Sequence, residues 1–209
     1  VAWTNRGPVE LEDINALIVH AKTTNKNLEI KSVDKFPRLT DYIVPSGVRI
    51  ADSSRVRLGA YLSEGTTVMH EGFVNFNSGT MGAAMIEGRI SAGVIVGKDS
   101  DLGGGCSTMG TLSGGNEIKI SIGKNCLLGA NSGLGIPLGD NCIVEAGLYI
   151  TGGSKVKKFN AKHESEGIVK AVDLSSKDNL LFIRNSLTGA IEARINLKSV
   201  TLNKSLHDN

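Results

Sequence analysis

The chain has 209 residues, with 23 Lys and Arg against 21 Asp and Glu, and its formal net charge is +2. So small a charge gives no long-range field, and it predicts neither a nucleic-acid partner nor a membrane partner. No apolar run is nearly as long as a membrane span, which needs about 20 residues, and no signal peptide opens the chain.

The amino-terminal part predicts a small α/β segment over residues 1–46. Apolar residues recur at helical spacing after Pro8, which suits a first helical position, and they predict a helix over residues 8–20. Leu28, Ile30 and Val33 indicate one strand. We expect this segment to cover the first coil of the repeat that follows. Because the chain begins with Val1 rather than Met, we interpret it as processed or as lacking an amino-terminal portion.

An aliphatic residue returns every six positions through residues 47–157, and glycine fills many of the intervening places. One run comprises Ile50, Val56, Leu62, Val68 and Val74, and another comprises Leu138, Val144, Ile150 and Val156. A six-residue unit with a short extended segment and a turn is typical of a parallel β-solenoid. Three units would close one coil, so this region predicts at most about six coils.

Two glycine-rich stretches, residues 75–93 and 103–118, interrupt the six-residue period. Departures from a regular scaffold are where functional sites are usually found, so we expect the site in these stretches.

Three cysteines without CxxC spacing favour neither a disulfide framework nor a zinc site. Cys126 and Cys142 each follow a repeat aliphatic residue by four positions, so we interpret them as buried thiols and expect a reduced, cytoplasmic setting.

After Val156 the sequence becomes polar and mixed, which predicts a small β cap and tail over residues 158–209. Residues 171–174 and 179–194 are interpreted as strands, with a turn near Leu187 and Gly189. The tail from Asn203 onward is expected to fray. The whole chain is therefore predicted to be mainly β.

Five strings carry a family resemblance: VRLGAYLSEGTTVMHEGFVNFN, IEGRISAGVIVG, MGTLSGG, CLLGANSGLGIPLGDNCIVEAGLYITGG and LLFIRNSLTGAIE. They resemble the tetrahydrodipicolinate N-succinyltransferases, in the form found in actinobacteria and their relatives. The match runs from about Val1 to Ile195. A hexapeptide unit alone would indicate only an acyltransferase-like solenoid, whereas IEGRISAG together with MGTLSGG is far narrower.

The resemblance implies a left-handed parallel β-helix that assembles as a homotrimer, with active sites between neighbouring subunits. It implies transfer of succinyl from succinyl-CoA to the amine of L-2-amino-6-oxopimelate, the opened form of tetrahydrodipicolinate, in the diaminopimelate route to lysine. Family members carry a further amino-terminal domain, which we expect this chain to lack.

An amine that attacks a thioester needs a group to handle its proton and donors that face the developing oxyanion. The resemblance places the first role on Glu87, as a nucleophile that forms an acyl-anhydride or as a general base. Glu87 and Arg89 would point to the same side of an extended chain. Gly110 could present a backbone N–H to the oxyanion. His70 is an alternative base, since other hexapeptide acyltransferases use a histidine.

The resemblance also assigns contacts with succinyl-CoA, along the repeat and in the cap. In the repeat they are Arg89, Gly104, Ser107, Ala130, Glu145, Ala146 and Gly153. In the cap they are Lys170, Arg184, Asn185 and Ser186, among which Lys170 and Arg184 could meet phosphates. Glu71 matches a position where the family can hold Mg²⁺ on a threefold axis. The companion aspartate is Ser54 in this chain, which weakens the predicted magnesium site.

Other functions remain open at this stage. An N-acetyltransferase acting on the same acceptor, or another hexapeptide acyl-CoA transferase, would use the same scaffold. A solenoid metalloenzyme needs three converging histidines, and only His70 lies in the repeat. A non-enzymatic binding solenoid should show an outward row of one residue type, and Thr66, Thr67 and Thr80 form no such row.

Overall fold

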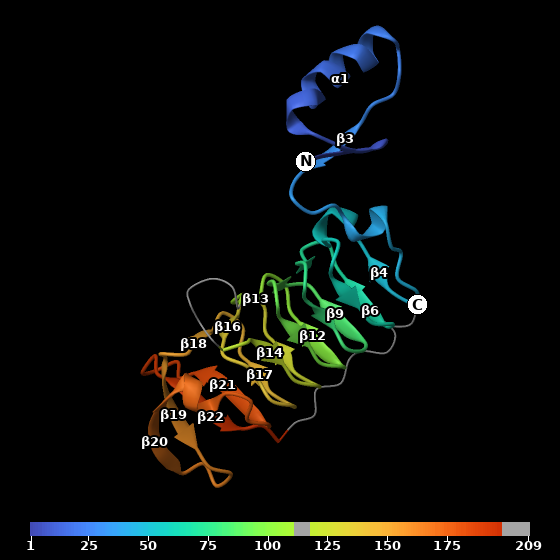
Figure 1. Ribbon diagram of the computed structural model, residues 1–209. Helices are drawn as coiled ribbons and strands as arrows, with labels where there is room; N and C mark the ends of the chain where they lie inside the picture. Colours follow the sequence, from blue (N-terminus) through green and yellow to red (C-terminus); the bar gives the residue numbers. More distant parts are fainter. Residues whose placement is uncertain (111–117, 198–209) are drawn as a thin grey trace.

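A computed structural model of the protein describes residues 1–110 and 118–197 (Figure 1). An antiparallel sheet in the order β2-β1-β3 and one helix form the amino-terminal segment. Its elements are β1 (Ala2–Thr4), β2 (Gly7–Val9), α1 (Leu11–Thr23) and β3 (Ile30–Val33). The predicted role of Pro8 as first helical residue is wrong. Pro8 lies in the edge strand β2 opposite Trp3, where a residue without an N–H is tolerated.

Three sheets, visited in turn by the chain, build the stack, and within the stack their strands pair in parallel. The strands of the stack that belong to a ten-stranded sheet are β4 (Arg49–Ile50), β6 (Thr66–Val68), β9 (Ala84–Ile86), β12 (Ser100–Leu102), β15 (Leu127–Leu128) and β17 (Ile143–Val144). A five-stranded sheet contains β7 (Phe73–Val74), β10 (Arg89–Ile90), β13 (Ser107–Thr108), β16 (Gly133–Gly135) and β18 (Tyr149–Thr151). A four-stranded sheet contains β5 (Tyr61–Leu62), β8 (Gly79–Thr80), β11 (Ile95–Val96) and β14 (Ser121–Ile122).

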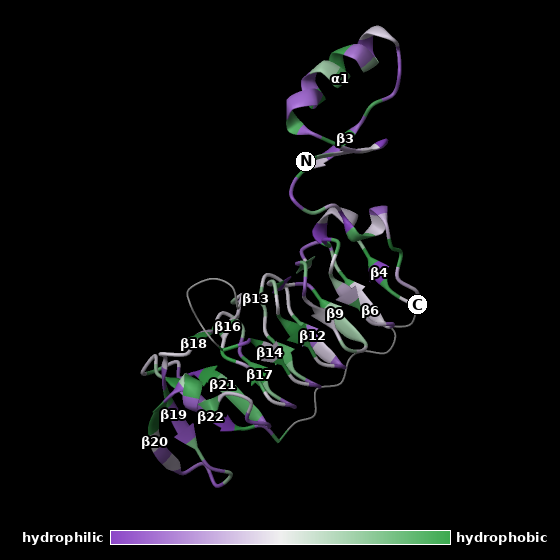
Figure 2. Cartoon of the chain, viewed as in Figure 1, coloured by the Kyte–Doolittle hydropathy of each residue, from purple (hydrophilic) through white to green (hydrophobic). Residues whose placement is uncertain are grey.

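The predicted aliphatic repeat forms the core of this stack. Val68, Ile86, Leu102, Leu128 and Val144 follow one another in register along the ten-stranded sheet, and each is 0% exposed. Each burial removes apolar surface from water at about 25 cal/mol per Å². Hydrophobic residues are frequent along the strands of the stack, whereas the cap strand β19 (Lys155–Phe159) is largely hydrophilic (Figure 2). The mainly β, hexapeptide-type architecture is thus confirmed.

The coils differ in length, and this corrects one prediction. Val68 pairs with Ile86, eighteen positions later, but Ile86 pairs with Leu102 after only sixteen. Residues 75–93 are therefore a regular part of the stack, containing β8, β9 and β10, and their weak six-residue period reflects a short coil. Leu102 pairs with Leu128 after twenty-six positions, so the second predicted interruption, residues 103–118, does lengthen a coil.

Both ends of the stack are covered, at the amino-terminal end by a short helix rather than by the predicted helix and strand, and at the other end by β strands, as the sequence predicts. At the amino-terminal end the short helix η1 (Leu39–Asp41) covers the first coil, and Leu39 is 2% exposed. The three-stranded sheet and α1 stand beyond it (Figure 1). At the other end lie β19 (Lys155–Phe159), β20 (Ser165–Lys170), η3 (Ala171–Leu174), β21 (Leu180–Arg184) and β22 (Ile191–Ile195).

The carboxy-terminal cap continues the ten-stranded sheet through the pairing of β17 with β21. The predicted hairpin over residues 179–194 is confirmed as β21 and β22. The predicted strand over residues 171–174 is wrong, because this segment is the 3-10 helix η3, with Lys170 N–H donating to the Asp173 carboxylate. The expected frayed tail lies outside the described residues.

A row of small polar side chains closes the corner between the four-stranded and the ten-stranded sheets, here called the four–ten corner. Each donates a hydrogen bond to a carbonyl of the next coil: Thr66 Oγ1 to Gly82, Ser100 Oγ to Gly123, Cys126 Sγ to Gly139 and Cys142 Sγ to Lys177. Cys126 and Cys142 are 0% exposed, which confirms them as buried thiols. Their role here is to satisfy buried backbone acceptors.

Candidate active site

A second corner, where the chain passes from the ten-stranded to the five-stranded sheet, is built differently. We call it the ten–five corner. After the stacked aliphatic residues Ile86, Leu102, Leu128 and Val144 the chain turns outward. In the cap, strand β21 continues past Phe182 and ends at Arg184. The turning residues in successive coils include Glu87, Gly103 and Gly104, Gly129 and Ala130, Glu145 and Ala146, and Arg184. Six of the predicted site residues therefore lie in one line along the stack.

Glu87 opens the turn that follows β9. Its backbone N–H donates to the Leu102 carbonyl at 2.8 Å, which fixes the residue against the next coil. The side chain is half-buried. A Cβ placed on Gly104 would lie 3.6 Å from Glu87 Oε2, so the carboxylate faces bare backbone in the neighbouring coil. The site thus presents an acidic side chain beside a segment without side-chain cover.

Small residues continue this uncovered line beyond Glu87. A Cβ on Gly103 would lie 2.8 Å from the Leu128 carbonyl oxygen and 2.9 Å from the Ala130 nitrogen, so only glycine fits there. Ala130 and Ala146, in the following coils, are exposed. A long, narrow ligand can therefore lie along this corner against backbone and methyl groups.

The predicted pairing of Glu87 with Arg89 on one extended segment is wrong. The chain bends at Gly88, so Glu87 ends on the ten-stranded side of the corner and Arg89 begins β10 in the five-stranded sheet. Within the described residues no ion pair joins them. The Arg89 guanidinium instead donates to Ser107 Oγ, from Nε at 3.0 Å and from Nη2 at 2.6 Å.

A cleft of about 550 Å³ lies beside this corner on the five-stranded sheet. The cleft extends from the first coils to the coil that contains Ser107. It is lined by Arg55, Glu71, Phe73, Gly88, Arg89, Gly105, Cys106 and Ser107. Cys106 contributes no nucleophile to it, because burial raises the pKa of its thiol to about 12, with the carboxylates of Asp101 and Glu87 adding to the effect.

Other predicted residues gather at the opposite ends of the same strands. A second cleft, of about 440 Å³, is lined by Met109, Ile118, Gly135, Thr151, Gly152, Gly153, Lys170 and Val172. Gly110 directly follows Met109, whereas the rest of the MGTLSGG motif, residues 111–115, lies outside the described residues. Gly110, Gly153 and Lys170 thus form a group separate from the line that contains Glu87.

The cap supplies the last residues of the ten–five corner. Arg184 N–H donates to Glu145 Oε2 at 2.7 Å, so this predicted pair is brought together. The Asn185 amide is held internally, since its oxygen accepts from Leu187 and Thr188 N–H and its nitrogen donates to Glu192 Oε1 at 2.9 Å. Asn185 therefore shapes the turn, and Ser186 is exposed on it.

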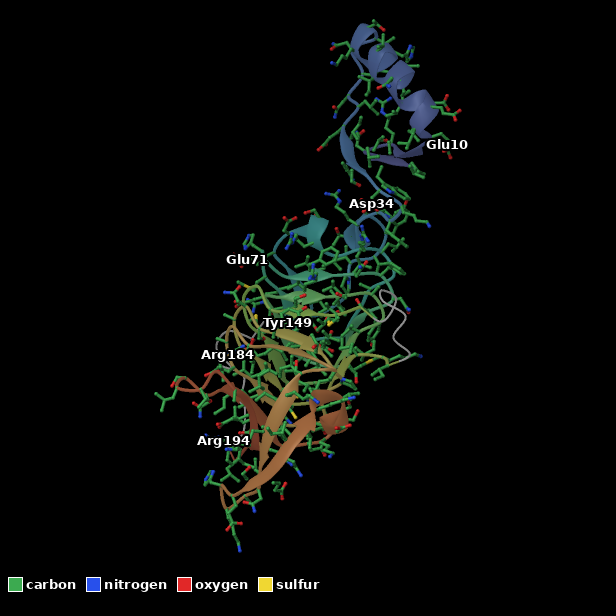
Figure 3. The ribbon with its side chains drawn as sticks, turned by 90° about the vertical axis from the view of Figure 1, so that its left-hand side faces the viewer. Glu10, Asp34, Glu71, Tyr149, Arg184 and Arg194 are labelled. Atoms are coloured by element: carbon green, nitrogen blue, oxygen red, sulfur yellow. The ribbon has the colours of Figure 1, made fainter. Side chains whose placement is uncertain are left out.

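Tyr149 and Gly133 also belong to this surface, although the sequence did not single them out. Tyr149 lies in register with Gly133, Ser107 and Arg89, and its ring occupies the space that a side chain on Gly133 would take. Figure 3 shows Glu71, Tyr149 and Arg184 spread along this side of the stack. Gly133 and Tyr149 lie sixteen positions apart, so their contact can be found only once the register is known.

The predicted metal ligand Glu71 is exposed at the ten–five corner of an early coil. The Ser54 hydroxyl donates to Asp52 Oδ1 at 2.7 Å, and this bond lowers the pKa of the Asp52 carboxyl. Over the described residues, no three His, Cys, Asp or Glu side chains of one chain converge as a metal site.

The described helices include none that is both long and apolar enough to cross a membrane.

Two family models match parts of the chain. The model for the middle part of tetrahydrodipicolinate N-succinyltransferase matches residues 1–38, and the model for the hexapeptide repeat of succinyl-transferase matches residues 119–152. The second segment contains Ala130, Glu145 and Ala146 of the ten–five corner.

Curated relatives match over nearly the whole chain. The 2,3,4,5-tetrahydropyridine-2,6-dicarboxylate N-succinyltransferase of Pseudomonas aeruginosa is 62% identical over 207 residues, covering 99% of this chain and 60% of the relative. That of Vibrio cholerae is 57% identical and covers 100% of this chain and 61% of the relative. The predicted family resemblance is confirmed. The actinobacterial form stays a prediction.

A solved structure shares the fold. The crystal structure of a Campylobacter jejuni protein described as a 2,3,4,5-tetrahydropyridine-2-carboxylate N-succinyltransferase superposes with a TM-score of 0.86 at 45% identity. The match covers 96% of this chain and 56% of the Campylobacter chain. The chain therefore spans about three fifths of the length of its relatives.

Proposed function

We propose that this chain carries the acyl-transfer site of a tetrahydrodipicolinate N-succinyltransferase. The reaction moves succinyl from succinyl-CoA to the amine of L-2-amino-6-oxopimelate, in the diaminopimelate route to lysine. The observation that carries this proposal is the continuous ten–five corner, where Glu87 is followed coil by coil by residues without bulky side chains. The names of the relatives supply the substrate class.

The stack is proposed to be a left-handed β-helix over residues 47–157, between an α/β segment (1–46) and a cap (158–209). The proposed assembly is a homotrimer, with each site completed by a neighbouring subunit. Glu71, His70 and the exposed line from Glu87 to Arg184 would then face the groove between subunits. The cytoplasm suits a protein that uses succinyl-CoA and whose three cysteines are free.

In the chemical step, the acceptor nitrogen forms a bond to the thioester carbon and the C–S bond breaks. The amine loses a proton, and the CoA thiolate leaves and is protonated. Glu87 is half-buried beside the bare backbone of Gly104, so a thioester lying along the corner would place its carbonyl carbon near the Glu87 carboxylate.

Two roles for Glu87 fit this placement. As general base, it accepts the amine proton while nitrogen attacks. As nucleophile, it first takes the succinyl group as an acyl-anhydride, releases CoA thiolate, and then yields the acyl group to the amine. Because no ion pair with Arg89 holds it, the carboxylate is free to act in either way. Gly110 lies apart from Glu87 within one chain. It is therefore proposed to donate its backbone N–H to the oxyanion of a site that contains Glu87 of a neighbouring subunit.

The pantetheine arm is proposed to follow the ten–five corner past Gly104, Ala130 and Ala146. Its phosphates would meet Arg184, which Glu145 holds at the end of this line. Ser107, Gly153 and Lys170 contribute from the five-stranded sheet and its second cleft. Asn185 acts by shaping the turn that carries Ser186 and the exposed Leu187.

Magnesium remains a weaker proposal. Glu71 supplies one carboxylate per subunit, and the hydroxyl of Ser54 already donates to Asp52. Mg²⁺ prefers several oxygen ligands in octahedral geometry, so one chain offers a poor fit, and we assign no step to the metal.

The test is release of CoA thiol from succinyl-CoA in the presence of the amino-oxo acceptor. We expect wild-type turnover, and a loss of at least about a hundredfold in Glu87→Ala, the size typical of a lost acid–base group. Glu64→Gln is the matched control, because Glu64 lies at the other corner of the stack. Robust turnover by Glu87→Ala would disprove the role of Glu87. Faster turnover of acetyl-CoA than succinyl-CoA would favour an N-acetyltransferase.

A further inference from the structure

One arginine of the stack holds the joint between the amino-terminal segment and the stack. The joint is residues 34–38, which connect β3 to η1, and Figure 3 shows Asp34 between the two parts. Arg57 Nη2 donates to Asp34 Oδ2 at 2.9 Å, and Arg57 Nη1 donates to Asn75 Oδ1 at 3.1 Å. Asn75 directly follows β7 of the five-stranded sheet. Arg57 therefore bridges the joint and the sheet that carries the 550 Å³ cleft.

Aromatic rings from both sides of the joint contact the Arg57 guanidinium. Its central carbon lies 5.5 Å from the centre of the Phe36 ring and 5.9 Å from the centre of the Phe73 ring. Phe36 belongs to the joint and stacks on Phe76 of the stack, with ring centres 4.3 Å apart. A guanidinium within about 6 Å of a ring centre is attracted by the negative face of the ring. Arg57 thus holds Phe36 and Phe73 in addition to its ion pair with Asp34.

Phe73 is the residue through which the joint meets the cleft. A cavity of about 130 Å³ beside the joint is lined by residues of the joint and by Arg57 and Phe73. Phe73 also lines the 550 Å³ cleft, together with Gly88, which follows Glu87. Arg55 lies 5.9 Å from the same ring, but its hydrogen bonds go to carbonyl groups of the next coil. Since a cavity offers the ring no packing atoms, the position of Phe73 on the side of the joint depends on Arg57.

We propose that Arg57 is a positioning residue, which ties the placement of the amino-terminal segment to the wall of the cleft beside Glu87. While Arg57 holds Asp34 and Phe36, it also fixes Phe73 between the cavity and the cleft. When these contacts open, the segment and the ring are released together. The tie itself does not depend on the reaction, whereas its effect on turnover rests on the proposed function.

The chain contains one tryptophan, and this residue reports on the joint. Trp3 lies in β1, and its Nε1 donates to the Asp34 carbonyl at 3.0 Å. Its ring meets Tyr42, directly after η1, with ring centres 6.2 Å apart and planes at 86°. The contact between Trp3 and Tyr42 crosses the joint, so an opened joint exposes the indole to a quencher.

The first experiment is acrylamide quenching of Trp3 fluorescence in the full chain. We expect the quenching constant of Arg57→Met to be at least about twofold larger than that of wild type. Arg49→Met is the matched control and should match wild type, since Arg49 also donates to a neighbouring coil, at Thr67 Oγ1, but on the ten-stranded sheet. Unchanged quenching in a folded Arg57→Met overturns the proposal. If Arg57→Met does not fold, Asp34→Asn removes the ion pair from the other side, and unchanged quenching there has the same meaning.

A second variant tests whether the joint and the cleft are tied. Phe73→Leu removes the ring that faces the cleft, and we expect it to raise Trp3 quenching as well. The double variant of Arg57→Met with Phe73→Leu should be quenched no more than the stronger single variant, because both substitutions act through one contact. Unchanged quenching in a folded Phe73→Leu, or additive effects of the two substitutions, overturns the tie.

A third measurement concerns turnover in the CoA-thiol assay. We expect kcat/KM to fall at least about fivefold in Arg57→Met, because the wall of the cleft is displaced, and to stay at the wild-type level in Arg49→Met. Increased Trp3 quenching with unchanged kcat/KM overturns the positioning role of Arg57. Absence of turnover in wild type rejects the proposed function, and the quenching results still decide the tie.

Discussion

The two corners at the ends of the ten-stranded strands share one backbone architecture and differ in what their side chains do. At the four–ten corner, Thr66, Ser100, Cys126 and Cys142 turn inward and donate to carbonyl groups of the next coil. At the ten–five corner, glycine and alanine leave the backbone uncovered, and the polar side chains of Glu87 and Glu145 point away from the core.

This difference shows how a repetitive fold separates stability from function. Side chains that point inward at the four–ten corner donate hydrogen bonds to buried carbonyl groups. Because these side chains are buried, they cannot contact a ligand. Small residues at the other corner let successive coils approach closely, and they leave a surface where a ligand can reach the backbone. Substitutions at the two corners should therefore have different consequences.

The largest effect on stability is expected for Gly103→Val. A side chain there would meet the Leu128 carbonyl and the Ala130 nitrogen at under 3 Å, and the coils would have to separate. We expect a loss of about 3 kcal/mol in the free energy of unfolding, measured by urea denaturation at fixed protein concentration. Gly153→Val is the control: with nothing within 4 Å of its Cβ position, it should change stability by less than about 0.5 kcal/mol. Equal effects would contradict the close contact at this corner.

A smaller effect is expected at the four–ten corner from Cys126→Ala. The Gly139 carbonyl loses its donor inside the core, which should cost about 1–2 kcal/mol in the same denaturation measurement. Cys126→Ser keeps a donor of similar size and should retain most of that stability. If serine is as destabilising as alanine, the hydrogen bond is not what this residue contributes.

The smallest effect concerns the last rung of the ten–five corner. Glu192 is 3% exposed, and the hydrogen bond from Asn185, with that from Arg194, lowers the pKa of its carboxyl below the ordinary 4.5. A lowered folded-state pKa stabilises the protein above pH 4.5, and that stability is lost as pH falls through the folded value. Stability between pH 7 and pH 3 should fall more steeply in wild type than in Glu192→Gln. Parallel curves would contradict this role.

How far the sequence predicts the fold depends on whether a feature repeats. The aliphatic period and the spacing of Cys126 and Cys142 predicted the stacked core and the buried thiols, because each coil imposes the same requirement on its inward positions. Strands β19 (Lys155–Phe159) and β20 (Ser165–Lys170) were not predicted, because their sequences are polar, mostly exposed and without a repeat.

Site residues were predicted through the family resemblance, and their arrangement was not. Residues 75–93 looked irregular because a coil of sixteen positions follows two coils of eighteen, so Glu87 occupies an ordinary corner rather than an interruption. The bend at Gly88 separates Glu87 from Arg89, which a two-residue spacing cannot reveal. The contacts of Tyr149 with Gly133 and of Arg55 with Phe73 join different coils, so they depend on the register.

The most direct test of the difference between the corners is one bulky residue placed at either corner of one coil. Ala130 and Lys124 are both exposed, Ala130 at the ten–five corner and Lys124 at the four–ten corner. Ala130→Trp should raise the KM for succinyl-CoA at least about tenfold by filling the groove, whereas Lys124→Trp should leave it unchanged. Equal KM values for the two variants, both folded, would contradict the assignment of the ten–five corner as the acyl-CoA site.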